Sequence, residues 1–337
     1  MRTARRWLAV SISFAAAAGC AARIGSTDRD LVPAVHEGYF VGAGGVRLFY
    51  RTVGSGSDTV VFVHGGPGGH MAQMHRDLLP LSRNRVVLYY DQRGGGRSGL
   101  PADTTALTLA DHVRDLEMLR VHFALSSLTL VAHSFGPAIA ANYAITHPDR
   151  VARMLFIAPI PPNIGTFPQA YVANLNARRD SAERGMLAVL QEALLSGPDP
   201  VAVCREIARI ALPHRVGVPA AVTRVRQDPC DAPPEALRYA ERYTSPRTFA
   251  SLGRWDWRAA LARVTTPTLV FYGEADLIPA AMVREWAAAL PNARVIAVPG
   301  AGHYLYVERP QEFFPVVDQF LAGQWPTTAV PIPTPSP

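Results

Sequence analysis

Three residues far apart in the sequence carry the side chains needed for nucleophilic catalysis: Ser134, Asp276 and His303. A serine hydroxyl is a weak nucleophile and needs a base, most often histidine, within hydrogen-bond reach. The base in turn needs a carboxylate that orients its imidazole and stabilises the imidazolium form. These residue types predict acyl transfer, with Ser134 as nucleophile, His303 as general base and Asp276 as orienting acid.

The residues around Ser134 are typical of a tight turn between a strand and a helix. An apolar run at 128–132 predicts a buried strand, and a small-residue stretch at 135–146 predicts the helix that follows. Strand and helix can pass closely only if the positions two before and two after the serine are small, and here they are Ala132 and Gly136. The alternative is that Ser134 only caps the helix.

Asp276 and His303 each follow an apolar run that predicts a strand, at 268–272 and 293–298. If these strands are parallel, both residues emerge at the carboxyl edge of the sheet, where ligands bind in open α/β folds. The chain order Ser, Asp, His matches a known order for such triads. Glu274 is the rival acid, but it lies nearer the end of its strand.

The glycine-rich loop 64–69 follows a third predicted strand, 59–63. Glycines let bare backbone N–H groups point at the negative charge that develops on a carbonyl oxygen, and we assign the two donors to the amides of Gly66 and Phe135. Such a loop could instead cradle a phosphate, but no Lys-Ser/Thr pair follows it.

The remaining histidines have plainer explanations. His112 and His122 are expected to be surface or helix-face residues, and His133 is the variable residue of the tight turn. The chemistry assigned to Ser134 needs no metal and no cofactor.

Strand and helix patterns alternate along most of the chain, which predicts the α/β class with a doubly wound, mostly parallel sheet. Further strands are expected at 39–41, 46–50, 86–90 and 151–157, and further helices at 108–123, 280–290 and 310–321. From 160 to 258 only helical stretches occur, at 182–195, 201–211 and 234–243. We interpret this insertion as a helical cap over the open end of the sheet.

These patterns divide the chain into five parts. We expect an export segment at 1–20, a tether at 21–35, a catalytic core at 36–159 and 259–323, the cap at 160–258 after the sixth strand, and a disordered tail rich in Pro and Thr at 324–337.

The first residues resemble a bacterial export signal: three arginines precede the apolar stretch 7–18, which is too short to span a bilayer. The stretch ends in Ala17-Ala18-Gly19-Cys20, which is similar to a lipoprotein cleavage site, although Ala17 stands where leucine is usual. We expect lipidation of Cys20 and a lipid anchor in the cell envelope as the protein's only link to a membrane. The alternative is cleavage near Ala22 and a periplasmic or secreted protein.

Cys204 and Cys230 then remain as an even pair in a chain sent to an oxidising compartment, which predicts a disulfide; two buried free thiols are the alternative. The formal net charge is +6, and every one of the 33 basic residues is arginine. Because these arginines are scattered along the sequence, we do not expect nucleic acid as a partner.

Two motifs carry a family resemblance. His64-Gly65-Gly66-Pro67-Gly68 and Asp91-Gln92-Arg93-Gly94-Gly95-Gly96-Arg97-Ser98 together resemble the proline iminopeptidase family of α/β hydrolases. The resemblance implies the α/β-hydrolase fold, with a mostly parallel sheet of the eight-stranded type flanked by helices. It also implies that His64, Gly65, Pro67, Asp91 and Arg93 organise loops.

The resemblance further implies an exopeptidase that removes small residues, often proline, from peptide amino termini, with acidic cap residues holding the substrate's ammonium group. The chain offers four acids in the cap, none in a recognisable motif: Glu192, Glu206, Glu235 and Glu241. It also departs from the family at the serine turn, which reads Ala-His-Ser-Phe-Gly at 132–136 in place of the usual Gly-Gly-Ser-Trp-Gly.

Three functions therefore remain open. The first is cleavage of amide bonds at the amino terminus of small peptides. The second is a carboxylesterase or lactonase acting on small esters. The third is a binding protein that keeps the fold without catalysis, since fold alone does not prove activity. A buried acidic pair beside the pocket would favour the first, and an apolar cap would favour the second.

Overall fold

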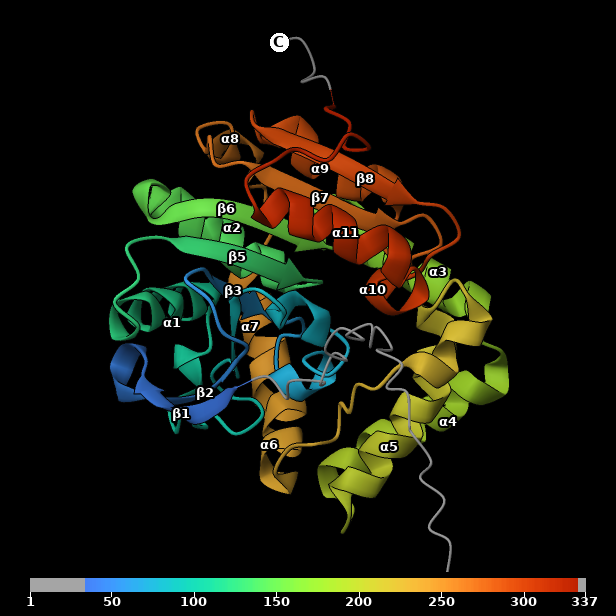
Figure 1. The fold of residues 1–337 in the computed structure, drawn as a ribbon. Helices are drawn as coiled ribbons and strands as arrows, with labels where there is room; N and C mark the ends of the chain where they lie inside the picture. The colour runs from blue at the N-terminus through green and yellow to red at the C-terminus, as the bar shows by residue number, and fades with distance from the viewer. Residues whose placement is uncertain (1–33, 333–337) are drawn as a thin grey trace, which may run out of the picture. The chain divides into compact units, whose positions relative to one another are not determined.

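The computed structural model describes residues 34–332, through which an eight-stranded sheet runs (Figure 1). The strands are β1 (Val35–Val41), β2 (Arg47–Val53), β3 (Thr59–Val63), β4 (Val86–Tyr90), β5 (Leu128–His133), β6 (Val151–Ile157), β7 (Thr268–Gly273) and β8 (Ala293–Val298). Their order in the sheet is β1-β2-β4-β3-β5-β6-β7-β8. Only β1 and β2 pair antiparallel to their neighbours, so the sheet is mostly parallel, as the alternating patterns predict.

Helices cover both faces of the sheet, and alternate residues of each strand point to opposite faces. In β3, Val61 and Val63 belong to one apolar layer and Val60 and Phe62 to the other. The first layer is completed by α1 (Leu109–His122), α2 (Gly136–Thr146), α8 (Arg258–Leu261) and α9 (Ala280–Ala289). The second layer contains α10 (Leu305–Glu308) and α11 (Pro310–Leu321). The two layers make a rigid support for the loops at the strand ends.

The cap is helical and follows β6, as expected. Its helices are α3 (Phe167–Arg178), α4 (Ser181–Ser196), α5 (Pro200–Ala211), α6 (Pro234–Tyr239) and α7 (Ser245–Leu252), the last two joined by a π-helical turn at Ala240–Thr244. Asp180 and Asp199 cap α4 and α5 by accepting hydrogen bonds from backbone amides of the first turn. Asn163 and Asp256 form a bridge where the chain leaves the core and returns to it.

Side chains of the cap fasten it to loops of the core. The hydroxyl groups of Thr244 and Thr248 donate to the carbonyls of Gly94 (2.7 Å) and Leu107 (2.9 Å). At the other end of the cap, Arg178 donates to the carbonyl of Ala275 at 2.6 Å. Each bond joins segments about a hundred residues or more apart in sequence. The position of the cap is therefore fixed by contacts with loops of the core.

The predicted disorder of 324–337 is wrong for residues 324–332. Trp325 packs against Phe320 with ring centroids 5.2 Å apart, and Val330 exchanges two backbone hydrogen bonds of 2.9 Å with Val295. The physical reason is that β8 is an edge strand, whose unpaired backbone groups offer a partner that Pro and Thr content does not reveal.

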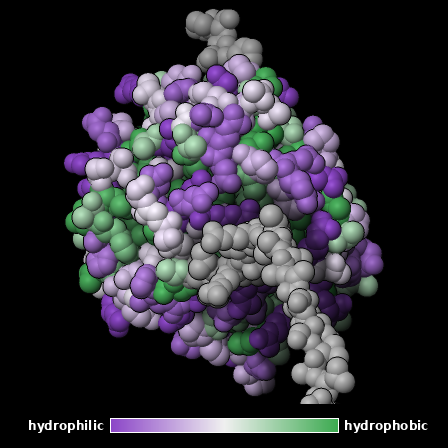
Figure 2. Space-filling model, in the orientation of Figure 1, coloured by the Kyte–Doolittle hydropathy of each residue, from purple (hydrophilic) through white to green (hydrophobic). Residues whose placement is uncertain are grey.

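The expected export segment, Cys20 and nearly all of the tether lie outside the described residues. Within residues 34–332, no helix has the length and apolar character needed to cross a membrane. Hydrophilic and hydrophobic residues are interspersed over the face of the molecule seen in Figure 2, because the large apolar side chains are mostly taken into the two layers.

Candidate active site

Ser134 lies on a tight turn between β5 and α2. Its φ is +59°, a left-handed conformation that residues other than glycine rarely adopt. The turn is held by hydrogen bonds from the Ser134 amide to Ile157 and from the Ile160 amide to Ser134, both of 2.9 Å. A Cβ at Gly136 would lie 2.2 Å from the carbonyl oxygen of Val63. This spacing explains why the position must be glycine, and it presents the serine side chain at the end of the sheet.

His303 and Asp276 meet although 27 residues separate them. The Nδ1 atom of His303 lies 2.8 Å from Oδ2 of Asp276, and both side chains are buried. The other oxygen of Asp276 accepts a hydrogen bond from the amide of Ile278. Glu274, the rival acid, is exposed. The pairing of Nδ1 leaves Nε2 of His303 as the unpaired ring nitrogen, and no hydrogen bond joins it to the hydroxyl of Ser134 within residues 34–332.

Ser134 and His303 line the same cavity, which has a volume of about 670 Å³. Gly65 packs on the serine so closely that a Cβ there would lie 2.9 Å from the Cβ of Ser134. Within residues 34–332, the amides of Gly66 and Phe135 donate to no protein acceptor. These two amides are therefore free to bind an oxyanion next to the serine.

The sequence matches the alpha/beta hydrolase family over residues 60–316. The chain belongs to this family. It is 26% identical over 299 residues to a proline iminopeptidase of Heyndrickxia coagulans, covering 85% of this chain and 98% of that protein. A second proline iminopeptidase, from Levilactobacillus brevis, is 26% identical over 292 residues, covering 82% of this chain and 93% of that protein. The relation to proline iminopeptidases that the two motifs indicate is therefore confirmed.

Solved structures agree on the fold. A proline iminopeptidase of Mycobacterium smegmatis superposes with a TM-score of 0.61 at 20% identity, over 85% of this chain and 98% of that one. A 2-hydroxy-6-oxo-6-phenylhexa-2,4-dienoate hydrolase of Rhodococcus superposes with a TM-score of 0.63 at 21% identity, over 86% of this chain and all of the other. At these identities the likeness concerns the fold alone, and the α/β-hydrolase fold is confirmed.

In this α/β hydrolase the two family motifs are bonded to each other. His64 accepts a hydrogen bond at Nε2 from the amide of Gln92 and donates from Nδ1 to the carbonyl of Gly65. Burial lowers the pKa of His64 to about 3, so the ring stays neutral. Asp91 accepts from the amides of Met71 and Arg97, both at 2.8 Å. These bonds hold the loop that contains Gly66 and Pro67 against the loop that follows β4.

Arg93 is buried and fixes the same loop to α1. It donates to both carboxylate oxygens of Asp115 at 2.6 Å, and to the carbonyls of Ala43 and Ala106 at 2.8 Å. All three nitrogen atoms of the guanidinium thus donate hydrogen bonds within the protein, and Arg93 does not line the cavity.

Glu308 is a functional candidate that the sequence analysis did not identify. Its carboxylate is buried at 2% exposure and accepts hydrogen bonds from the amides of Gly302 (2.9 Å) and Tyr304 (3.2 Å), the neighbours of His303. It also accepts from the amides of Gly217 (2.7 Å) and Val218 (2.9 Å) in the cap. One carboxylate therefore sets the position of the His303 loop. The only signal in the sequence was its place five residues after His303.

His133 also has a closer connection with the site than its variable position in the turn indicates. Its ring lies 4.6 Å from the ring of His303, centroid to centroid, and its Nε2 donates to the carbonyl of His303 at 3.1 Å. Burial lowers its pKa well below the usual value, so it acts as a neutral donor that supports His303.

His112 is buried, and the expectation of a surface residue is wrong. Helix α7 of the cap covers it, and its Nε2 lies 3.4 Å from the hydroxyl of Thr248. Burial lowers the pKa of His112 to about 3. The helical pattern of α1 could not reveal this, because the covering helix comes from another part of the chain.

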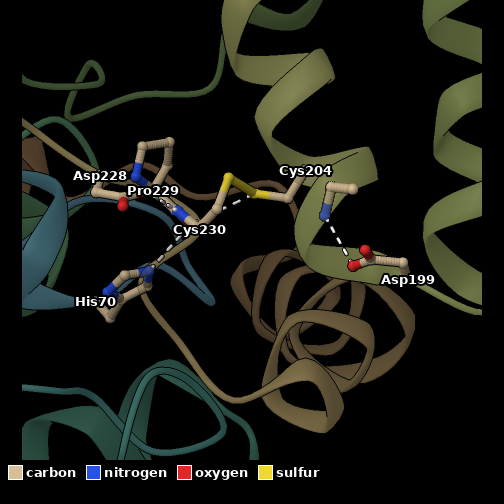
Figure 3. The surroundings of a disulfide bond; sticks show 7 residues. His70, Asp199, Cys204, Asp228, Pro229 and Cys230 are labelled. Carbon is tan, nitrogen blue, oxygen red and sulfur yellow. Dashed lines mark hydrogen bonds between the residues drawn. A yellow bond between two sulfur atoms is a disulfide. The ribbon is translucent and has the colours of Figure 1, made fainter.

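Cys204 and Cys230 form a disulfide that joins two parts of the cap beside the cavity (Figure 3). Cys204 lies on α5, and Cys230 lies in the loop before α6. The neighbouring carbonyl of Pro229 accepts a hydrogen bond of 3.0 Å from Nε2 of His70, a residue of the core (Figure 3). The disulfide thereby links α5 to the core through the segment around Pro229.

Most of the four cap acids offered as possible ammonium ligands lie away from the cavity. Only Glu241 lines the cavity, and it is exposed. Glu192 and Glu235 are exposed outside it, and Glu206 pairs with Arg209. The charged cap residues along the cavity are instead mainly arginines: Arg205, Arg209 and Arg215.

Proposed function

We propose that this protein is a serine hydrolase that forms an acyl-enzyme on Ser134. The observation that carries the proposal is the 2.8 Å contact of His303 with Asp276 on the cavity that Ser134 also lines. An intact nucleophile, base, acid and oxyanion site argue against a catalytically silent binding protein.

In the proposed reaction, the Ser134 oxygen attacks the substrate carbonyl while Nε2 of His303 takes the hydroxyl proton. The amides of Gly66 and Phe135 hold the oxyanion. When the carbon–heteroatom bond breaks, His303 gives its proton to the leaving alcohol or amine. A water molecule, deprotonated by His303, then attacks the acyl carbon, and His303 returns that proton to the Ser134 oxygen as the acyl–serine bond breaks and the acid is released.

For the substrate, the proline iminopeptidase relatives support an amide at a peptide amino terminus. The lining of the cavity supports the other expectation, a carboxylesterase or lactonase that acts on small esters. No buried acidic pair lines the cavity among the described residues, and the apolar cap side chains Phe167, Tyr171 and Ile207 do. We therefore place acyl esters before peptides.

The test is labelling with a fluorophosphonate probe, together with turnover of proline and acyl-ester chromogenic substrates. Ser134→Ala should abolish labelling and reduce kcat by at least about a thousandfold, because only binding and the oxyanion site remain. Turnover of ester but not of proline anilide would support the order given above. Wild-type protein that neither reacts with the probe nor turns over any substrate would favour the binding protein.

We also propose that the protein is exported and lipid-anchored through Cys20. A disulfide between Cys204 and Cys230 supports export, because disulfides persist in oxidising compartments. Labelled palmitate should be incorporated into the wild type and not into Cys20→Ser; equal incorporation would refute the anchor.

A further inference from the structure

Arg215 differs from the other arginines along the cavity. Arg209 is exposed and already paired with Glu206 at 2.6 Å, and Arg205 is exposed. Arg215 is half-buried and ends the short turn Leu212–Arg215 that follows α5. Its position is fixed from the core, because its carbonyl accepts a hydrogen bond of 2.8 Å from the amide of His303. The side chain therefore enters the cavity beside the catalytic base.

The guanidinium of Arg215 lacks an anionic partner among residues 34–332. Its Nη1 reaches the hydroxyl of Tyr304 at 3.4 Å, and its Nε is buried without any hydrogen-bond acceptor. No carboxylate oxygen of the described residues lies within 4.0 Å of it. The nearby acids are engaged elsewhere, Asp276 by His303 and Glu308 by four amides.

A second arginine raises the positive charge in this region. The Nε of Arg179, at the end of α3, is also buried without an acceptor among the described residues. Its pKa is lowered by burial and then by the positive charge of Arg215. Glu183, an acid whose charge acts on Arg179, is hydrogen-bonded to His214.

An unpaired cation in a partly desolvated position is costly, and proteins normally offset that cost with a carboxylate. Among residues 34–332 no carboxylate lies within 4.0 Å of the Arg215 guanidinium, whereas the cavity that Arg215 lines is open to a ligand. A guanidinium is well suited to a carboxylate because its planar donors match the two oxygens.

We propose that Arg215 binds a carboxylate of the substrate, so that the preferred substrate is a small ester or amide that carries a free acid group. This proposal rests on the acyl-transfer function proposed above. The substrate would then carry a negative charge, where a peptide substrate would carry the positive charge of its ammonium group.

The experiment uses two pairs of esters that differ in one charge. The first pair is 4-nitrophenyl hemisuccinate and 4-nitrophenyl butyrate, with the acid on the acyl side. The second is 4-acetoxybenzoate and its methyl ester, with the acid on the leaving side. Wild type, Arg215→Gln, Arg215→Lys and the control Arg209→Gln are compared by kcat/KM.

For at least one pair, wild type should prefer the acid, and Arg215→Gln should lower kcat/KM for that acid by about 10- to 100-fold, the range for a lost hydrogen bond to a charged group. The neutral ester should change by less than about threefold. Arg215→Lys should restore part of the preference, and Arg209→Gln should retain it.

Two results would overturn the proposal: no preference for the acid in either pair, or an equal loss for acid and neutral ester in Arg215→Gln, which would make Arg215 a support for the His303 loop. Fluorophosphonate labelling separates these results from failure of the proposed function. If the wild type does not label at all, the acyl-transfer function itself is wrong; if Arg215→Gln labels as the wild type does, the triad is intact and the ester comparison decides.

Discussion

The core and the cap form the same cavity, but they differ in how their polar groups are paired. On the core side, His303 is bonded to Asp276, and Glu308 accepts four amides. On the cap side, Arg215 lines the cavity with no carboxylate within 4.0 Å among residues 34–332, and its Nε has no hydrogen-bond acceptor. Groups whose hydrogen bonds are all made within the protein are held in one geometry, whereas a group without an acceptor can bind a ligand. If both proposals hold, the core supplies the chemistry and the cap selects the substrate.

The sharpest way to break this comparison is to remove the orienting acid of the core. Asp276→Asn should lower kcat by about 10⁴-fold for every substrate, because an amide favours the wrong tautomer of His303. Steady-state turnover of 4-nitrophenyl butyrate measures the loss. The matched control is Glu274→Gln, an exposed acid two residues away, which should have little effect. A larger loss of kcat in Glu274→Gln than in Asp276→Asn would make Glu274 the orienting acid.

Loss of the disulfide tests the cap alone. Cys204→Ser combined with Cys230→Ser opens a loop with a sequence separation of 26, which should lower the free energy of unfolding by about 3 kcal/mol. Thermal unfolding with and without a reducing agent measures this effect. The reductant should shift the melting temperature of the wild type and leave the double variant unchanged. If the cap selects the substrate and the core supplies the chemistry, the double variant should change KM more than it changes the rate of fluorophosphonate labelling.

Glu308→Gln tests the contact between core and cap, because Glu308 accepts hydrogen bonds from amides of both. A glutamine side chain must direct an NH₂ group at amides that themselves donate, so the His303 loop should shift and kcat should fall about 10- to 100-fold, as for the loss of charged hydrogen bonds of about 1.5–3 kcal/mol. A positioning residue should change kcat more than KM, for acidic and neutral esters alike. Glu312→Gln, an exposed acid in α11, serves as the control. Unchanged kcat would remove Glu308 from the site.

The last comparison concerns pH and the burial of core histidines. Burial lowers the pKa of His64 and His112 to about 3 and that of His75 to about 4, from an ordinary value of 6.5. Unfolding therefore takes up protons below pH 6.5, and the folded state should lose stability as the pH falls from 6.5 toward 4. Each histidine contributes about 1.4 kcal/mol per pH unit to the slope of the free energy of unfolding against pH.

His112→Gln should reduce that slope by the share of one histidine, as measured by urea unfolding at several pH values. The exposed His36→Gln should leave the slope as it is in the wild type. An unchanged slope in His112→Gln would mean that its ring is accessible to water, and that α7 does not seal the core.

Much of the core was predictable because its strands and tight turns depend on the residues of short segments. The strand before Ser134 and the small residue at Gly136 follow from a turn so tight that a single Cβ would collide with Val63. The meeting of Asp276 with His303 followed from two parallel strands ending at one edge. In contrast, Glu308 and His112 have ordinary helical surroundings in the sequence, and partners from distant segments decide their roles.

The sequence by itself determined the class of fold, the residue types able to transfer an acyl group and the family, because these depend on periodicity and on motifs of a few residues. Only the tertiary structure decided that Glu241 alone of the four cap acids lines the cavity, that Val330 pairs with β8, and that no carboxylate of residues 34–332 lies within 4.0 Å of Arg215. The physical reason is that charge pairing and burial depend on which distant segments come together, and the cap takes its place on the core through contacts that no local pattern encodes.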